Sequence, residues 1–231
     1  MKADSLKKII QNIEDNITFA LIKDLKNSKE IFFYPDIDPI NYSNLPEKLI
    51  LDIHEALKKD KSLKIDIDNN QYFVQVFNLQ LRLIIIGAVH IAFSLSKMAS
   101  LVGYEVTIVD PRKSFLESQD FSDFNLISKW PDEALEYLNI DRRTAIVTLS
   151  HDPKLDEPAL IQAFKANPFY IGALGSKKTH KKRTERLSDL GIEVHNINRI
   201  NSPVGLDLGA ISPEEISVSI LAEMTKYLRK K

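Results

Sequence analysis

Residues 81–110 read LRLIIIGAVHIAFSLSKMASLVGYEVTIVD, and they are the most informative part of the chain about its architecture. Two apolar runs, 81–87 and 104–110, are separated by a segment of helical length, 90–102. Strands that are apolar throughout are typical of parallel sheets covered by helices on both faces. The stretch therefore predicts a strand, a helix and a second, parallel strand.

The same alternation continues towards the C-terminus. Further strands are predicted at 124–130, 144–150 and 168–176, and further helices at 131–138, 157–166, 177–190 and 213–229. The last helix has a capping box, with Ser212 before Pro213 and Glu215 three residues after the serine. We expect residues 79–231 to form a Rossmann-like α/β domain, a parallel sheet with helices on both faces.

The N-terminal part has a different pattern. A helix at 4–16 is followed by a predicted hairpin with strands at 17–22 and 30–34, and then by a helix at 46–59. The segment 63–77 alternates apolar and polar residues around Asn69-Asn70, which indicates a strand pair with one buried face. Residues 1–78 are thus predicted to be a small α+β domain.

Composition excludes several classes of protein. The 231 residues include 31 Lys and Arg against 32 Asp and Glu, a net charge of -1, which gives no electrostatic reason to expect nucleic-acid or membrane binding. The chain has no cysteine, so disulfides and thiolate metal sites are excluded. No stretch approaches the length of a transmembrane helix, and the N-terminus lacks a signal-peptide pattern, so we expect a cytoplasmic protein.

The turn after the first parallel strand contains Gly87, where a dinucleotide-binding fold has its first glycine. The second glycine of that fingerprint would stand at Val89, whose side chain would crowd a diphosphate. Asp110 ends the next strand, where an acidic residue binds a ribose hydroxyl in NAD-binding folds. The alternative is that Asp110 only turns the chain into Pro111 and Arg112.

The loop after the strand at 144–150 carries two further candidates. His151 and Asp152 would emerge at the carboxyl edge of the sheet, where ligands of such folds bind. His151 is either an acid, base or hydrogen-bond donor, or a loop residue bonded to backbone. Asp152 is alternatively a helix cap, and for Asp156 a cap is the favoured interpretation.

Residues 172–183, GALGSKKTHKKR, lead from a strand through a glycine turn into a helix that begins with cations. Free amides and the helix dipole favour an anion at such a start, and phosphate is the natural guest. The alternative is a solvated basic face. The candidate binding residues are Gly175, Ser176, Lys177, Lys178, Thr179 and His180.

The segment 203–210, PVGLDLGA, precedes the last helix. Gly205 and Gly209 permit close contact of the backbone with a ligand, and Asp207 between them is a candidate polar contact. A connecting loop would explain the same residues.

Several of these motifs together resemble the C-terminal domain of the XdhC/CoxI family. They are GAVHIA, VTIVDPR, VTLSHDPKLDEPAL, YIGALGSKKTHKKR and PVGLDLGAISPEEISVSILAE, and the resemblance covers residues 79–228. It implies a Rossmann-like accessory protein that binds molybdenum cofactor (molybdopterin), protects it during sulfuration and delivers it to a molybdenum hydroxylase apoenzyme of the xanthine or CO dehydrogenase type. A sulfurtransferase and a second copy of the chain are further candidate partners.

The resemblance implies a ligand cleft lined by the turn at Gly87, the His151-Asp152 loop, the Gly175–Arg183 loop and helix, and the Gly205–Gly209 loop, with no catalytic residue and no metal ligand assigned. The candidate cofactor-binding residues are Gly87, Ala88, His90, Asp110, His151, Asp152, Gly175, Ser176, Lys177, Lys178, Thr179, His180, Gly205 and Asp207. Two departures matter: the family pattern is GAGH where this chain has GAVH, and residues 1–78 lack the family's cysteine-containing motifs.

Three functional hypotheses follow from the sequence. The first is a non-catalytic chaperone that binds molybdenum cofactor. The second is an NAD(P)- or nucleotide-binding oxidoreductase or sensor, which Val89 disfavours and Asp110 favours. The third is a degenerate family member that acts mainly through protein contacts.

Overall fold

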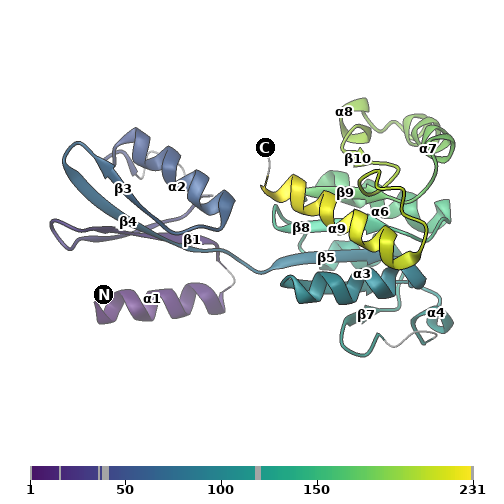
Figure 1. Cartoon of the computed structure of the whole chain (residues 1–231), viewed down its shortest axis with the longest axis horizontal. Coiled ribbons are helices and arrows are strands. Elements are labelled where there is room, and N and C mark those ends of the chain that lie inside the picture. The colour runs from purple at the N-terminus through teal and green to yellow at the C-terminus, as the bar shows by residue number, and fades with distance from the viewer. Residues whose placement is uncertain (1, 16, 36, 38–41, 118–120, 230–231) are drawn as a thin grey trace. The chain divides into compact units, whose positions relative to one another are not determined.

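The computed structural model describes residues 2–15, 17–35, 37, 42–117 and 121–229. By its contacts the chain divides into two compact units, Met1–Leu79 and Gln80–Lys231, which are described separately (Figure 1). The predicted domain boundary lies between residues 78 and 79, one residue from this division. Residue 16, the last of the predicted N-terminal helix, lies outside the described residues.

The first unit is an antiparallel sheet with one helix on each face. The sheet has the strand order β2-β1-β4-β3. Its strands are β1 (Phe19–Asp24), β2 (Glu30–Phe33), β3 (Leu63–Ile67) and β4 (Asn70–Phe77). Helix α2 (Glu47–Lys59) covers the face that carries Ile22 and Val74. Helix α1 (Ala3–Glu14) lies on the opposite face, where Ile9 packs against Phe19 and Leu21.

The second unit is built on a six-stranded sheet in which every pairing is parallel. The strand order is β10-β9-β8-β5-β6-β7. The strands are β5 (Leu81–Ile86), β6 (Tyr104–Val109), β7 (Asn125–Ile127), β8 (Thr144–Thr148), β9 (Tyr170–Ala173) and β10 (Ile200–Asn201). The helices are α3 (His90–Leu101), α4 (Lys113–Glu117), α5 (Pro131–Tyr137), α6 (Pro153–Lys165), α7 (Lys177–Asp189), α8 (Val194–Ile197) and α9 (Pro213–Arg229).

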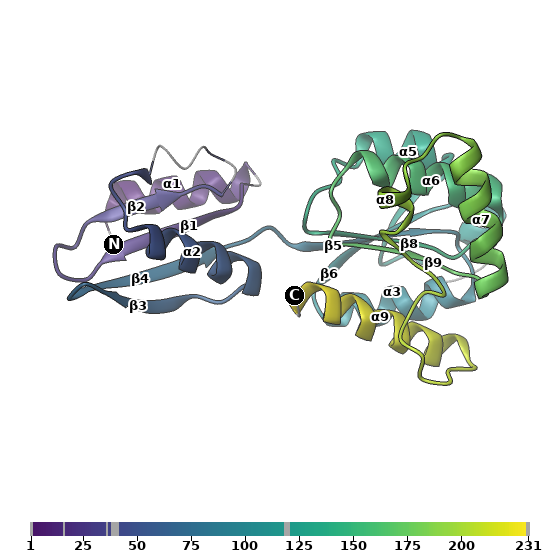
Figure 2. The same ribbon diagram turned by 90° about the horizontal axis from the view of Figure 1, so that it is seen from above.

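Both faces of this sheet are buried, which explains the continuous apolar strands. In β5, Leu83 and Ile85 pack on the side of α3 and α9, whereas Ile84 and Ile86 pack on the side of α5, α6 and α7. Figure 2 shows the sheet between these two helical layers. The predicted fold class, a Rossmann-like parallel sheet preceded by a small α+β unit, is confirmed.

Several elements differ from the sequence prediction. Helix α6 begins at Pro153, four residues before the predicted start, because Asp152 caps it and proline is well tolerated in the first turn. Its second proline, Pro158, lies inside the helix. The short elements α4, α8 and β10 were not predicted, and β7 is shorter than the run 124–130.

Among the described residues, no helix combines the length and apolar character needed to cross a membrane.

Candidate functional site

The loops that follow the parallel strands meet at the carboxyl edge of the six-stranded sheet. The chain adds β6 and β7 on one side of β5 and then β8, β9 and β10 on the other. The strand order therefore reverses between β5 and β8, and ligands of open α/β sheets bind at the carboxyl edge beside such a switch point. In Figure 1 this edge lies at the right-hand end of the second unit, near α4 and the start of α9.

Gly87 directly follows β5 and has a backbone conformation that other residues rarely adopt. Its φ is +103°, and a Cβ atom here would lie 2.9 Å from Ser150 in the loop after β8. The loops on the two sides of the switch point therefore touch, and only a glycine permits this contact. His90, the first residue of α3, is exposed at the same edge.

The amides of the Gly87 loop are engaged within the protein. Ala88 N donates to the Asp110 carboxylate at 2.9 Å, and Val89 N donates to Gly87 O at 3.0 Å. Two amides that could have contacted a diphosphate are therefore already used. Together with the Val89 side chain, this leaves the NAD(P) hypothesis without support.

Asp110 turns the chain into Arg112, as the second interpretation of the sequence proposed. Its side chain is completely buried and receives the Arg112 guanidinium, with Nε donating to Oδ1 at 2.9 Å and Nη2 to Oδ2 at 2.7 Å. These bonds and the Arg112 charge lower the pKa of Asp110 in spite of its burial. Asp110 therefore positions Arg112, which is partly exposed and stacks on Phe115 with its Cζ 3.8 Å from the ring centre.

His151 and Asp152 occupy the loop after β8. His151 is exposed and has a φ of +60°, a conformation uncommon for residues other than glycine. Asp152 is the N-cap of α6, since its side chain accepts a hydrogen bond from Lys154 N at 2.9 Å. A residue in a strained conformation, beside a capped helix start, thus lies at the switch point.

Asp156 is not a helix cap, so that interpretation was wrong. It lies in the first turn of α6 with only 1% of its surface exposed, because the helix begins four residues earlier than expected. Ser150 Oγ donates to Asp156 Oδ1 at 2.6 Å, and Arg183 lies 3.7 Å from Oδ2. Burial raises the pKa of Asp156 above its ordinary value, although Ser150 and Arg183 act in the opposite direction.

The turn after β9 opens helix α7, as predicted. Ser176 is the N-cap, and its Oγ accepts a hydrogen bond from Thr179 N at 3.2 Å and lies 3.0 Å from Thr179 Oγ1. Lys177 and Lys178 are exposed in the first turn, and their amides have no hydrogen-bond partner among the described residues. The turn therefore presents two open amides and two cations to the solvent.

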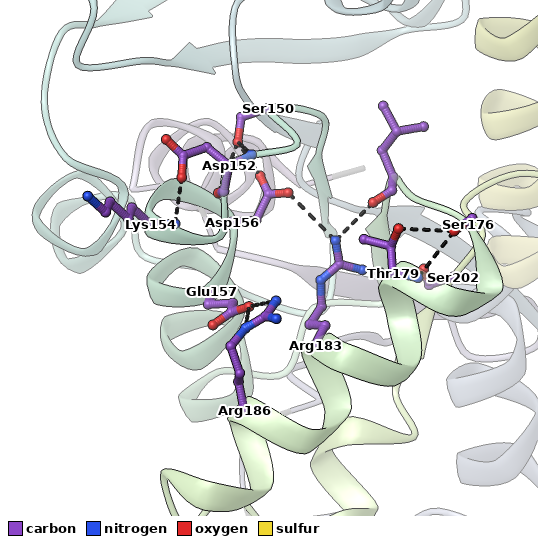
Figure 3. Close-up of polar contacts among 11 residues, drawn as sticks. Ser150, Asp152, Lys154, Asp156, Glu157, Ser176, Thr179, Arg183, Arg186 and Ser202 are labelled. Atoms are coloured by element: carbon purple, nitrogen blue, oxygen red, sulfur yellow. Dashed lines mark hydrogen bonds and ion pairs between the residues drawn. The ribbon is translucent and has the colours of Figure 1, made fainter.

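Arg183, one helical turn further on, connects three of the edge loops. Its Nη2 donates to Leu174 O at 2.9 Å, its Nη1 donates to Ser202 Oγ at 3.3 Å, and it forms the ion pair with Asp156 (Figure 3). These partners follow β9, β10 and β8 respectively. Arg183 is 3% exposed, and burial lowers its pKa.

His180, in the first turn of α7, is partly buried. Its Nδ1 atom is buried and has no hydrogen-bond partner among the described residues, and burial together with the Arg183 charge lowers its pKa. The ring is therefore neutral at pH 7 and does not add to the charge of the lysines.

The Gly205–Gly209 loop is tied to helix α9. Gly205 N and Tyr170 Oη both donate to Glu223 Oε2, at 3.0 Å and 2.5 Å. Burial and Glu223 raise the pKa of Tyr170, so the phenol stays protonated. A side chain at Gly205 would overlap Ser219, so this glycine serves packing against α9, while Asp207 is exposed.

A family model described as the XdhC Rossmann domain matches residues 83–224 of this chain, most of the second unit. The chain belongs to the XdhC family. The match confirms the resemblance that the edge motifs indicated.

Two curated relatives carry names that refer to xanthine dehydrogenase and to molybdenum cofactor insertion. The chain is 31% identical over 191 residues to a probable xanthine dehydrogenase subunit of Bacillus subtilis (strain 168), covering 82% of this chain and 56% of that protein. It is 40% identical over 85 residues to "Molybdenum cofactor insertion chaperone PaoD" of Escherichia coli (strain K12), covering 37% and 27%. The chain thus spans about half the length or less of these two relatives.

A solved structure has a similar fold. It is described as a xanthine dehydrogenase (BH1974) from Bacillus halodurans, and it matches with a TM-score of 0.69 and 23% identity, over 99% of this chain and 65% of that one. At this identity the likeness concerns the fold alone.

The structure places the predicted binding residues in loops and first helical turns that follow the parallel strands, and direct contacts connect many of these segments. Gly87 contacts Ser150, and Asp110 holds Ala88. Arg183 connects Asp156, Leu174 and Ser202, which follow β8, β9 and β10. Asp207 takes part in none of these contacts. In the described ranges, no group of three His, Asp or Glu residues could hold a metal ion.

The residues that hold this edge together are not among the predicted binding residues. They are Arg112, Ser150, Arg183, Ser202 and Glu223. For Arg183 a signal was present, since it lies four residues before the buried Leu187 on the inner face of an otherwise basic helix.

Proposed function

We propose that this protein binds molybdenum cofactor at the carboxyl edge of its Rossmann unit and assists its insertion into a molybdenum hydroxylase of the xanthine dehydrogenase type. The observation that carries the proposal is the start of α7. Ser176 caps this helix by accepting a hydrogen bond from Thr179 N, and the amides of Lys177 and Lys178 stay open among the described residues. Membership of the XdhC family and similarity to a chaperone of molybdenum cofactor insertion support the choice of ligand.

The phosphate of molybdopterin suits this helix start. Two amides at a helix N-terminus and two lysine side chains stabilise a dianion through charge-assisted hydrogen bonds. In this proposal the phosphate occupies the Ser176–Thr179 turn, and the flat pterin extends over the loop after β8 towards Arg112. The guanidinium of Arg112, oriented by Asp110, offers donors to the carbonyl and nitrogen acceptors of the pterin.

Charge reversal at the helix start tests the proposal. Replacing Lys177 and Lys178 by glutamate places two negative charges beside the open amides, so the affinity for molybdopterin is expected to fall by about tenfold or more. Titration of the purified protein with molybdopterin, followed by the intrinsic fluorescence of the ligand, measures the change.

The matched control is the pair Lys181→Glu and Lys182→Glu. These lysines are also exposed on α7 but lie one turn beyond the open amides. The control variant has the same net charge as the test variant and should bind molybdopterin nearly as tightly as the wild type. Equal losses in both variants would reduce the site to a general basic face, and a folded wild type without affinity for molybdopterin would refute the function itself.

A further inference from the structure

Helix α1 is packed on its sheet through one flank only. Its buried residues are Ser5, Ile9 and Asn12, two of which are polar. The apolar Leu6, Ile10 and Ile13 are 46%, 48% and 55% exposed, and Ile17, just beyond the helix, is 39% exposed. Leu6, Ile10 and Ile13 are spaced by four and three, as in the seam of a coiled coil, and together with Ile17 they are called the α1 stripe below. The more apolar side of α1 therefore faces the solvent within its unit.

Contacts to the sheet show towards which strand the α1 stripe is turned. Ser5 and Asn12 bond to Glu30 and Tyr34 at the two ends of β2, while Ile9 packs on β1. Successive residues of a helix are about 100° apart, so the surface of α1 turns from β2, at Ser5 and Asn12, to β1, at Ile9. The α1 stripe lies further round in the same direction and therefore faces the next strand in the sheet, β4.

The same face of β4 is incompletely covered. Phe77 stacks on Phe19 of β1 with ring centres 4.6 Å apart, and Phe73, four residues earlier on this face, is 38% exposed. The α1 stripe, which is turned towards β4, and the aromatic residues Phe73 and Phe77 of β4 thus lie on the same face of the sheet in the first unit.

The charged residues beside the α1 stripe are complementary to the same residues in a second, antiparallel copy of the helix. Lys7 and Glu14 flank the stripe seven residues apart, both are exposed, and neither forms an ion pair with any residue that the structure describes. When two copies of α1 run antiparallel with Ile10 of one opposite Ile13 of the other, Lys7 of each copy lies beside Glu14 of its partner. Because a two-fold axis relates the two copies, this ion pair forms twice, as a symmetric dimer interface requires.

We propose that a second copy of this chain covers the α1 stripe, so that the protein is a two-fold dimer joined through antiparallel α1 helices. The order of charges favours this occupant, because a second copy already carries the matching sequence. The interface lies in the first unit and the α7 helix start belongs to the second, so this inference does not depend on the proposed function.

Mass measurement on the full chain gives the first test. Light scattering and analytical ultracentrifugation are expected to show a particle of twice the monomer mass of 26.3 kDa that dissociates on dilution. A wild type that stays monomeric up to high micromolar concentrations overturns the proposal.

Ile10→Lys places a charge in the centre of the α1 stripe and should give a monomer at concentrations where the wild type is dimeric. The control, Leu51→Lys, changes a residue that is 64% exposed on α2, on the opposite face of the sheet, and should remain dimeric. A dimer that persists in a folded Ile10→Lys variant places the interface elsewhere and overturns the proposal.

A charge swap tests the antiparallel register without touching the apolar residues. Lys7→Glu and Glu14→Lys each turn two attractions into two repulsions, and each should raise the dimer dissociation constant by about tenfold. The double variant restores both pairs with reversed sign and should recover most of the wild-type dissociation constant. Additive losses in the double variant overturn the proposed pairing.

Discussion

At the scale of single residues, Gly87 illustrates how two loops at the switch point depend on one missing side chain. Gly87→Ala adds a Cβ atom 2.9 Å from Ser150 to a backbone with positive φ. We expect the free energy of unfolding to fall by about 2 to 4 kcal/mol, from backbone strain and overpacking together. Urea denaturation measures the change.

Gly103→Ala is the matched control, since Gly103 also has a positive φ, of +94°, but a Cβ atom there would have no neighbouring atom within 4 Å. It should cost only the backbone strain, about 1 kcal/mol. If Gly87→Ala lowered the free energy of unfolding no more than Gly103→Ala does, the loop after β8 would be able to move away from the added Cβ atom without a cost in stability.

The raised pKa of Asp156 predicts an unusual pH dependence of folding stability. Its pKa is raised above 3.8 in the folded protein by burial, against the charges of Arg183, His151 and, across the edge, Arg112. The folded state therefore binds this proton more tightly than the unfolded state does. The contribution of Asp156 to stability is full below pH 3.8 and is lost as pH rises through the raised pKa.

Asp156→Asn removes this titration while keeping the size of the side chain. The stability of the wild type relative to the variant should decrease as pH rises above 3.8, which urea denaturation at a series of pH values measures. Asp189→Asn, at an exposed position on α7, serves as the control. A difference that grows with pH would mean that the Arg183 charge outweighs burial.

At the scale of elements, local patterns predicted most of the second unit. Strands such as β5 are buried on both faces, and Ser176, Pro131 and Ser212 mark helix starts by their own chemistry. The start of α6 was placed four residues too late, although Pro153 at its first position is typical of a helix start. Strand β10 was missed because two residues carry no periodicity, and only pairing with β9 makes them a strand.

The candidate site was predictable in part for the same reason. The glycine turns and the basic helix start can be recognised from adjacent residues. Because they follow predicted parallel strands, they are expected at the carboxyl edge of the sheet. The Asp156–Arg183 pair joins residues 27 positions apart, and Glu223 meets Gly205 across 18. Such long-range polar contacts depend on which elements the fold brings together, so adjacent residues cannot reveal them.

At the scale of the whole molecule, the two units have separate apolar cores. The core clusters of the first unit contain buried residues up to Val74, and those of the second begin at Leu81. Each unit therefore has the buried contacts that cooperative folding requires. The proposed functions are also separate, since the α7 start belongs to the second unit and the α1 stripe to the first.

Expression of residues 80–231 alone tests this division. The fragment is expected to unfold cooperatively, to bind molybdopterin with the affinity of the full chain, and to be monomeric because it lacks α1. Calorimetry, ligand titration and light scattering measure the three properties. A folded fragment that has lost its affinity would assign part of the ligand site to the first unit, whereas a dimeric fragment would remove α1 from the interface, so the two proposals fail independently.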